Sequence, residues 1–371
     1  MKTILRNFLS VLRRFRMAVG LNVIGLSVAF TAFLVIMMQV SYDHSFDRCH
    51  PKAERIFMAE LCDSMMADCR VIYPGAFPDV LIASSPHIEA GTMITPYDKL
   101  NYLSTGQESD AEGFREKVTT CHPAIVDIFG FSFIEGDKDC LADPEKAIIP
   151  ESMARRMFGG ESAIGRQIHF KEGVWTKDHR DLTVGGVYRD FPENTQLRNV
   201  VYTAIDPDYN INNFSSSNWV CYLLLDNPAM ADEVADNFNR HFDFKKIYHE
   251  GEQIRLVPLT DIYYMNETQD GGTFRSGNKE VTALLFGIAL LIVIVAAINF
   301  TNFSTSLTPL RIKSINTQKV LGSSTASLRI SLMIEAIAIC LFSCLLSFLL
   351  TWMLNRSGVL TFVEADTNML H

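Results

Sequence analysis

Side chains that could bind a metal or move protons follow the first long apolar segment of the chain. The stretch DHSFDRCH, residues 43–50, contains Asp43, His44, Asp47, Cys49 and His50. Carboxylates, imidazoles and thiolates are the usual ligands of zinc and other transition metals. The spacing matches no standard zinc pattern, however, and polar residues are expected where an apolar helix emerges into water. We therefore predict no metal site and no cofactor, and keep a membrane-anchored metalloenzyme as the weakest alternative.

Catalytic motifs with a known mechanism are missing from the sequence. It contains no G-x-x-x-x-G-K-[ST] loop to cradle ATP phosphates, no G-x-S-x-G and no H-E-x-x-H. Asp190 and Glu193 could be taken for a carboxylate pair, but Pro192 and Asn194 favour a turn at this point. We predict a protein without catalytic residues of its own.

Three long apolar segments predict membrane-spanning helices. Residues 17–42, 281–303 and 336–354 contain no Asp, Glu, Lys or Arg. Each is close to the roughly 20 residues that a helix needs to cross about 30 Å of hydrocarbon. Three such runs are hard to hide in a soluble core. The first is longer than the apolar part of a cleaved signal peptide and is followed by no small-residue cleavage site, which favours an uncleaved anchor.

Charge divides the chain into an acidic centre with basic flanks. Residues 1–42 hold five basic and no acidic side chains, whereas 43–280 hold 23 basic and 39 acidic ones. Basic segments next to a span stay on the cytosolic side of the membrane, so the large acidic centre lies outside the cytosol. An acidic centre also argues against nucleic acid as a partner.

The predicted layout alternates between the two sides of the membrane. It consists of a cytosolic N-terminus (1–17), a first transmembrane helix (18–40), an outside domain (41–280), a second transmembrane helix (281–303), a cytosolic segment (304–329), a third transmembrane helix (330–354) and an extracytoplasmic tail (355–371).

The outside domain is predicted to be mixed α+β, with room for two lobes. EKAIIPESMARRMFG (145–159) indicates a strand, a turn at Pro150 and a helix closed by glycine. DNPAMADEVADNFNRHF (226–242) indicates a helix with Asp226 or Asn227 as its N-cap. EQIRLVPLTDIYY (252–264) indicates a strand. Six cysteines in this domain can pair in 15 ways, of which Cys62 with Cys69 closes the shortest loop.

A short basic stretch, RIKSINTQKVLGSS (311–324), separates the second and third spans. Pro309 fits the first turn of a helix, and Gly322 fits its end. Ser323, Ser324 or Thr325 can cap the next helix. Apolar and basic residues mix along this helix, so it is an imperfect amphipathic one. It is either a loop that fixes orientation and rests on lipid headgroups, or a rigid handle that docks in a groove on a cytosolic partner.

This stretch resembles the coupling segment of MacB/FtsX-type ABC transporter permeases. Their pattern is close to R-x-K-E-[IV]-G-[IV]-R-K-[VAL]-[LMI]-G-[AS]-[ST], with a Glu at the start of the following span. The matching residues are Arg311, Lys313, Ile315, Lys319, Val320, Leu321, Gly322, Ser323, Ser324 and Glu335, and the departures are Ser314, Asn316 and Gln318. Segments 42–57, 148–168 and 183–196 resemble the MacB-like periplasmic core domain of Bacteroidetes-type members, and the resemblance covers nearly the whole chain.

The resemblance implies a function and a set of partners. It implies a permease subunit of the bacterial inner membrane that couples ATP hydrolysis by a separate cytosolic ABC ATPase to motion of its periplasmic domain, for export or release of a substrate. It assigns ATPase coupling to Arg311, Lys313, Ile315, Lys319, Val320, Leu321, Gly322 and Glu335. It implies a second permease copy or half as a further partner within the lipid bilayer.

Family members usually carry a fourth span in each unit, and the segment after residue 354 is too polar to provide one. We therefore expect either a fragment of a longer permease or a partner that supplies the rest. A membrane sensory protein with an extracytoplasmic ligand-binding domain is the alternative function.

Overall fold

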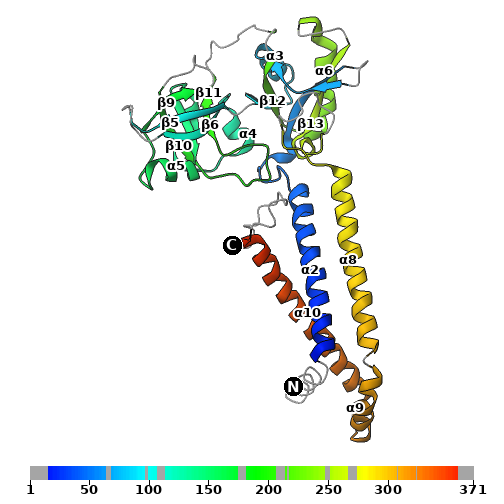
Figure 1. Ribbon diagram of the computed structural model, residues 1–371. Helices are drawn as coiled ribbons and strands as arrows, with labels where there is room; N and C mark the ends of the chain where they lie inside the picture. Colours follow the sequence, from blue (N-terminus) through cyan, green and yellow to red (C-terminus); the bar gives the residue numbers. More distant parts are fainter. Residues whose placement is uncertain are drawn as a thin grey trace. The chain divides into compact units, whose positions relative to one another are not determined.

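The computed structural model describes residues 16–63, 68–96, 99–106, 113–173, 181–205, 214, 217–246, 251–265, 274–306, 308–322 and 324–357. The chain forms two compact units (Figure 1). One is a helical unit made of the segments up to His44 and from Lys279 onwards, and the other is the domain Ser45–Asn278.

In its described residues the helical unit contains four helices: α2 (Arg16–His44), α8 (Lys279–Ser306), α9 (Thr308–Val320) and α10 (Thr325–Arg356). Three of them, over Val19–His44, Lys279–Ser306 and Thr325–Arg356, are long and apolar enough to cross a membrane. A helix rises 1.5 Å per residue, so even the shortest of the three, with 26 residues, is about 39 Å long. The helices extend beyond the predicted apolar runs because the backbone stays helical into the flanking polar residues.

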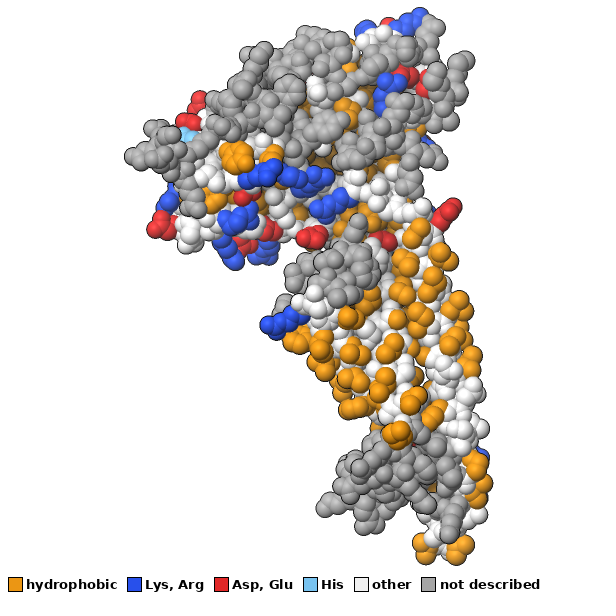
Figure 2. Space-filling model, viewed as in Figure 1, with side chains coloured by type: hydrophobic (Ala, Val, Ile, Leu, Met, Phe, Trp, Pro, Cys, Tyr) orange, Lys and Arg blue, Asp and Glu red, His pale blue; other side chains and the backbone are white. Residues whose placement is uncertain are grey.

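Helix α2 packs against both α8 and α10. Val19 and Leu26 of α2 form a small core with Ala296 of α8 and Ile339 of α10. The helices also expose many large apolar side chains, which Figure 2 shows along the face in view. Such a surface has a low free energy in hydrocarbon and a high one in water, so the unit is built for the bilayer.

The domain is built on a 13-stranded sheet. Its strands are β1 (Ile56–Asp63), β2 (Asp68–Arg70), β3 (Tyr73–Pro74), β4 (Ile88–Ile94), β5 (Lys99–Ser104), β6 (Gly113–Cys121), β7 (Phe133–Gly136), β8 (Lys146–Pro150), β9 (Gln167–Gly173), β10 (Leu182–Tyr188), β11 (Val201–Ala204), β12 (Ser217–Leu225) and β13 (Glu252–Pro258). Its helices are α3 (Ala76–Ile82), α4 (Ile125–Phe129), α5 (Glu151–Phe158), α6 (Ala231–His241) and α7 (Leu259–Ile262), with short 3-10 turns at Ala53–Arg55, Lys138–Ala142, Pro228–Met230 and Phe244–Lys246.

The strand order is β11-β8-β10-β9-β5-β6-β4-β12-β1-β13. A parallel pairing between β11 and β6 closes six of these strands into a ring. The remaining strands continue the sheet, and α3 and α6 cover one face of β1, β12 and β13 in a shared apolar cluster. The largest cluster contains Met58 of β1 and Tyr222 of β12 together with Tyr188 and Tyr202 of the ring. The expected two lobes are therefore not confirmed, because one sheet runs through the whole domain and its largest apolar cluster takes residues from the ring and from the strands that continue it.

Local patterns in the sequence predicted several of these elements. Strand β8, helix α5 and the left-handed Gly159 (φ 63°) follow the predicted strand, turn and helix. Asn227 caps the turn before α6 by accepting a hydrogen bond from Ala229 N. The strand predicted over 252–264 is wrong at its end, because the chain turns into α7 directly after Pro258.

Candidate functional site

Helix α9 has a defined beginning and end. It starts at Thr308, two residues after α8 ends, and its last turn runs into Gly322 with a left-handed φ of 89°. A left-handed backbone is the conformation that glycine adopts at the end of a helix. Ser324 then caps α10, since its Oγ accepts a hydrogen bond from Ser327 N at 3.2 Å. The predicted start, glycine stop and serine cap are confirmed.

The end of α9 presents apolar and basic side chains to solvent. Val320 and Leu321 are 87% and 79% exposed, and the preceding residue, Lys319, is also exposed. Arg311 and Lys313 lie on α9, but their side chains fall outside the described part of the structure. Two large apolar side chains are therefore exposed side by side at the end of α9.

The inner side of α9 contacts the membrane helices. Ile315 lines a cavity of about 110 Å³ together with residues from all three membrane helices. Glu335 of α10 lines the same cavity, so the structure brings these two predicted coupling residues together. The other lining residues, which the sequence did not single out, are Val19, Phe300, Phe303, Ser304, Thr308, Leu332, Ala336 and Ile339.

Asp43 joins two membrane helices rather than binding a metal. Its Oδ2 accepts a hydrogen bond of 2.6 Å from Thr282 Oγ1 of α8, and its Oδ1 accepts one of 2.8 Å from Gln39 Nε2 of α2. A carboxylate that accepts hydrogen bonds from two hydroxyl or amide donors fixes the ends of both helices. Sequence reasoning missed this contact because the two partners are 239 residues apart.

Asp47 and His50 lie buried at the start of the domain, with exposed fractions of 0% and 3%. The hydroxyl of Thr195 lies 2.7 Å from Asp47 Oδ1 and 2.8 Å from His50 Nε2, and His50 Nδ1 lies 3.0 Å from Phe129 O. Both ring nitrogens of His50 are therefore used within the protein. Cys49 is exposed. Among the described residues, the potential ligand atoms of the 43–50 stretch do not form a group of three or more close enough to share a metal ion.

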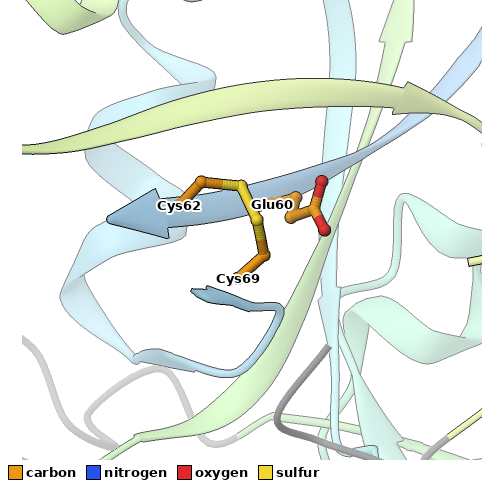
Figure 3. Close-up of side chains that lie close together, drawn as sticks. All are labelled: Glu60, Cys62 and Cys69. Atoms are coloured by element: carbon orange, nitrogen blue, oxygen red, sulfur yellow. A yellow bond between two sulfur atoms is a disulfide. The ribbon is translucent and has the colours of Figure 1, made fainter. Parts of the chain in front are cut away.

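Cys62 and Cys69 form a disulfide across the antiparallel pair β1–β2, which joins the residues of the shortest predicted loop (Figure 3). Among the described residues, these two sulfurs and a Glu60 oxygen are the one group close enough to share a metal ion. The sulfurs are oxidised, however, and Arg255 donates two hydrogen bonds to Glu60 Oε2 at 2.9 and 2.6 Å. The group is therefore a structural cross-link beside an ion pair in which Glu60 is buried and Arg255 is exposed.

Comparison with protein families decides between the permease and the sensory alternative. Residues 19–241 match the model of the MacB-like periplasmic core domain, and residues 286–365 match that of the FtsX-like permease C-terminal region. The chain belongs to the MacB/FtsX-type ABC transporter permeases. This permease is a membrane protein with a mixed α/β extracytoplasmic domain, and its described residues include three helices able to span a membrane. Its family is one of transporter subunits that are typically not catalytic.

Solved structures similar to the permease come from several bacteria. A domain of a putative permease protein from Porphyromonas gingivalis is 21% identical, covers 64% of this chain and 98% of its own, and has a TM-score of 0.46. The periplasmic region of MacB from Actinobacillus actinomycetemcomitans is 14% identical, with coverages of 56% and 89% and a TM-score of 0.38. The extracellular domain of the noncanonic ABC-type transporter YknZ from Gram-positive bacteria is 12% identical, with coverages of 54% and 98% and a TM-score of 0.38. No curated protein matches the chain.

Proposed function

We propose that the permease couples ATP hydrolysis by a separate cytosolic ABC ATPase to motion of its periplasmic domain, for export or release of a substrate. One observation carries this proposal: α9 exposes Val320 and Leu321 at its end while Ile315 reaches a cavity between the membrane helices. A partner that binds the exposed end can therefore move the membrane helices through the side of α9 that carries Ile315.

The connections of α9 favour transmission of force rather than a flexible loop. Helix α8 ends at Ser306 and α9 begins at Thr308, and the link 321–324 to α10 contains the left-handed Gly322 and the capping Ser324. Short connections of this kind let a displacement of one helix shift its neighbours as rigid bodies.

The basic residues of α9 support its placement in the cytosol. The positive-inside rule assigns the loop that carries Arg311, Lys313 and Lys319 to the cytosolic side and the acidic domain to the periplasm. The location in the bacterial inner membrane follows from this orientation together with the family. A second permease copy or half completes the proposed complex.

The proposal is tested by reversing the charge of α9. The double variant Arg311→Glu, Lys319→Glu replaces two basic groups that would face the ATPase, so we expect it to lose co-purification with a nucleotide-hydrolysing subunit from native membranes. Mass spectrometry of the purified complex identifies that subunit. Unchanged co-purification of the subunit with the double variant would refute the proposed coupling role.

A matched control reverses two basic residues of the domain instead. Arg155 and Arg166 have side chains that are 74% and 44% exposed. The variant Arg155→Glu, Arg166→Glu changes the net charge by the same amount and is expected to keep the ATPase subunit. Loss of the subunit in both double variants would indicate an effect of net charge alone.

A further inference from the structure

The first and last residues of the domain are tied together by two bridges. Phe46 stacks on Tyr263 with ring centroids 4.1 Å apart, and Gly277 N donates a 2.7 Å hydrogen bond to Tyr263 O. A Cβ at Gly277 would lie 2.2 Å from the ring of Tyr263, so glycine is required for this close approach. Tyr263 thus contacts both ends of the domain segment.

The second bridge is the loop 193–196. Asn194 O accepts a hydrogen bond of 2.8 Å from Asp47 N, and Asn194 Nδ2 donates one of 2.9 Å to Ser45 Oγ. On the other side, Gln196 exchanges two hydrogen bonds with the backbone of Arg275, at 2.7 and 3.0 Å. Since Ser45 follows α2 and Asn278 precedes α8 in the chain, this loop holds the two segments that connect the domain to the membrane.

The contacts among Asp47, Thr195 and His50 determine how many hydrogen atoms this part of the bridge must contain. Phe129 O can only accept, so His50 Nδ1 must carry a hydrogen. Thr195 has a single hydroxyl hydrogen, but its oxygen lies within hydrogen-bond distance of both Asp47 Oδ1 and His50 Nε2. If Thr195 donates to Asp47, His50 Nε2 must also carry a hydrogen. If Thr195 donates to His50, Asp47 must be protonated.

Both arrangements contain the same number of protons. Each holds one proton more than the combination of a neutral imidazole and an ionised carboxylate. That combination has only two hydrogen atoms for three contacts, namely His50 with Phe129 O, His50 with Thr195 and Thr195 with Asp47. Gln196 N and Leu197 N supply further hydrogen bonds, to Asp47 Oδ1 at 2.7 Å and to Thr195 Oγ1 at 3.3 Å, and do not change this count. An acceptor–acceptor contact in a buried site costs about the desolvation of a polar group, roughly 1–3 kcal/mol.

We propose that Asp47, Thr195 and His50 form a buried proton-binding site whose shared proton closes the link between residues 45–50 and the loop 193–196. The site is buried: Asp47 Oδ2 has no hydrogen-bond partner among the described residues, and the rings of Phe129 and Phe191 flank His50 at 5.0 and 5.5 Å. In such surroundings an unpaired carboxylate is costly, and a proton removes that cost.

Other titratable and charged groups near the site do not replace the proton. Those that face Asp47 are His50 and Cys49 on its own segment, Arg275 on the last segment of the domain and Tyr222 on β12. The Arg275 guanidinium donates to Glu193 O rather than to Asp47. Burial raises the pKa of Asp47 to about 7 and lowers the pKa of His50 to about 4, which favours a protonated carboxyl beside a neutral imidazole.

The test measures both protonation states in the full chain in lipid nanodiscs at about pH 6. Nitrogen chemical shifts of ¹⁵N-labelled histidine, assigned with His50→Gln, report which ring nitrogens of His50 carry hydrogen. The infrared difference between the wild type and Asp47→Asn reports whether Asp47 is protonated. We expect either a protonated Asp47 with a neutral His50 that is protonated on Nδ1, or an ionised Asp47 with a doubly protonated His50.

A neutral His50 beside an ionised Asp47 would overturn the proposal. Thr195→Ser keeps the hydroxyl and is expected to keep the signals, whereas Thr195→Val removes the hydrogen-bond partner of His50 Nε2 and is expected to shift the signal of that nitrogen. His87, which pairs with Asp226 at 3.1 Å and is partly exposed, serves as the control histidine. The measurement needs no ATPase, so its failure is distinct from a failure of the coupling role.

Discussion

Asp47 and His50 depart in opposite directions from their ordinary protonation behaviour. In the unfolded chain an aspartate titrates near 3.8 and a histidine near 6.5, whereas burial moves the pKa of Asp47 to about 7 and that of His50 to about 4. Between about pH 4 and 6.5, folding therefore releases one proton from His50 and takes up one at Asp47. The two effects on the free energy of unfolding have opposite signs, so they offset each other in the wild type.

Replacing His50 by glutamine removes this compensation. Folding of His50→Gln takes up a proton at Asp47 without releasing one, so the free energy of unfolding should fall as the pH rises from about 4 to about 7. The variant's curve should be steeper than that of the wild type by up to about 1.4 kcal/mol per pH unit. Chemical denaturation of the full chain in detergent at several pH values measures this slope.

The exposed pair His87–Asp226 provides the control for this experiment. His87→Gln also removes one histidine, but from a partly exposed position, so it should leave the slope close to that of the wild type. If the free energy of unfolding changed with pH equally in the wild type and in His50→Gln, the opposite pKa shifts of Asp47 and His50 would be contradicted.

The disulfide between Cys62 and Cys69 gives a second prediction at the residue scale. It closes a short loop, since the two cysteines are seven positions apart. Loop-closure entropy for such a loop is about 2 kcal/mol. The double variant Cys62→Ser, Cys69→Ser should therefore lower the free energy of unfolding by about this amount. A reductant should lower the free energy of unfolding of the wild type to the value of the double variant. A wild type that is insensitive to reductant would argue against the bond.

Residue identity alone revealed only part of this chemistry. The cysteine loop was the cheapest to close and is formed, and Asp43 to His50 could be recognised as a polar cluster. The sequence could not show that Asp43 binds Thr282 or that Thr195 lies between Asp47 and His50, because these partners are more than 140 residues away in the chain. Contacts at such separations depend on the tertiary fold.

At the scale of the element, α9 was the most predictable part of the chain. Pro309, Gly322 and Ser324 act through local backbone geometry, and such effects can be deduced from neighbouring residues. The helix α7 was missed because LVPLTDIYY has the apolar content of a strand, and the turn after Pro258 depends on packing: Leu259 and Ile262 are buried in the main core.

Gly322 should resist substitution even though it has space around it. A Cβ at this position meets nothing within 4 Å, so the difficulty lies in its φ of 89° and not in a clash. Gly322→Ala should destabilise the end of α9 by about 1 kcal/mol, because an L-residue is strained in the left-handed region. Faster amide exchange at Leu321 and Gly322, which bond to Thr317 O and Lys319 O, would reveal the loosened turn.

Asparagine tolerates the left-handed conformation better than alanine. The amide hydrogen of Leu321 should therefore exchange more slowly in Gly322→Asn than in Gly322→Ala. Equal exchange rates in the wild type and both variants would show that the backbone conformation at residue 322 does not hold the end of α9.

At the scale of the whole molecule, composition predicted most of the architecture. The uncharged runs indicated three membrane helices, one before and two after the acidic extracytoplasmic domain in the sequence. This prediction is possible because the free-energy cost of burying charge in hydrocarbon is large and does not depend on detailed packing. The single sheet that runs through the domain could not be predicted, since the parallel pairing of β11 with β6 joins strands about 80 residues apart.

The side of the membrane on which α9 lies is the central claim, and labelling of a cysteine at Lys319 tests it most directly. The variant Lys319→Cys is made with the exposed Cys49 replaced by serine, and Glu161→Cys on the domain, whose side chain is 73% exposed, serves as the control. In intact cells, a membrane-impermeant thiol reagent should label Glu161→Cys once the outer layers are permeabilised, and should reach Lys319→Cys only after the inner membrane is opened. Labelling of Lys319→Cys from the outside, with the inner membrane intact, would contradict the coupling role of α9 and the orientation on which it depends.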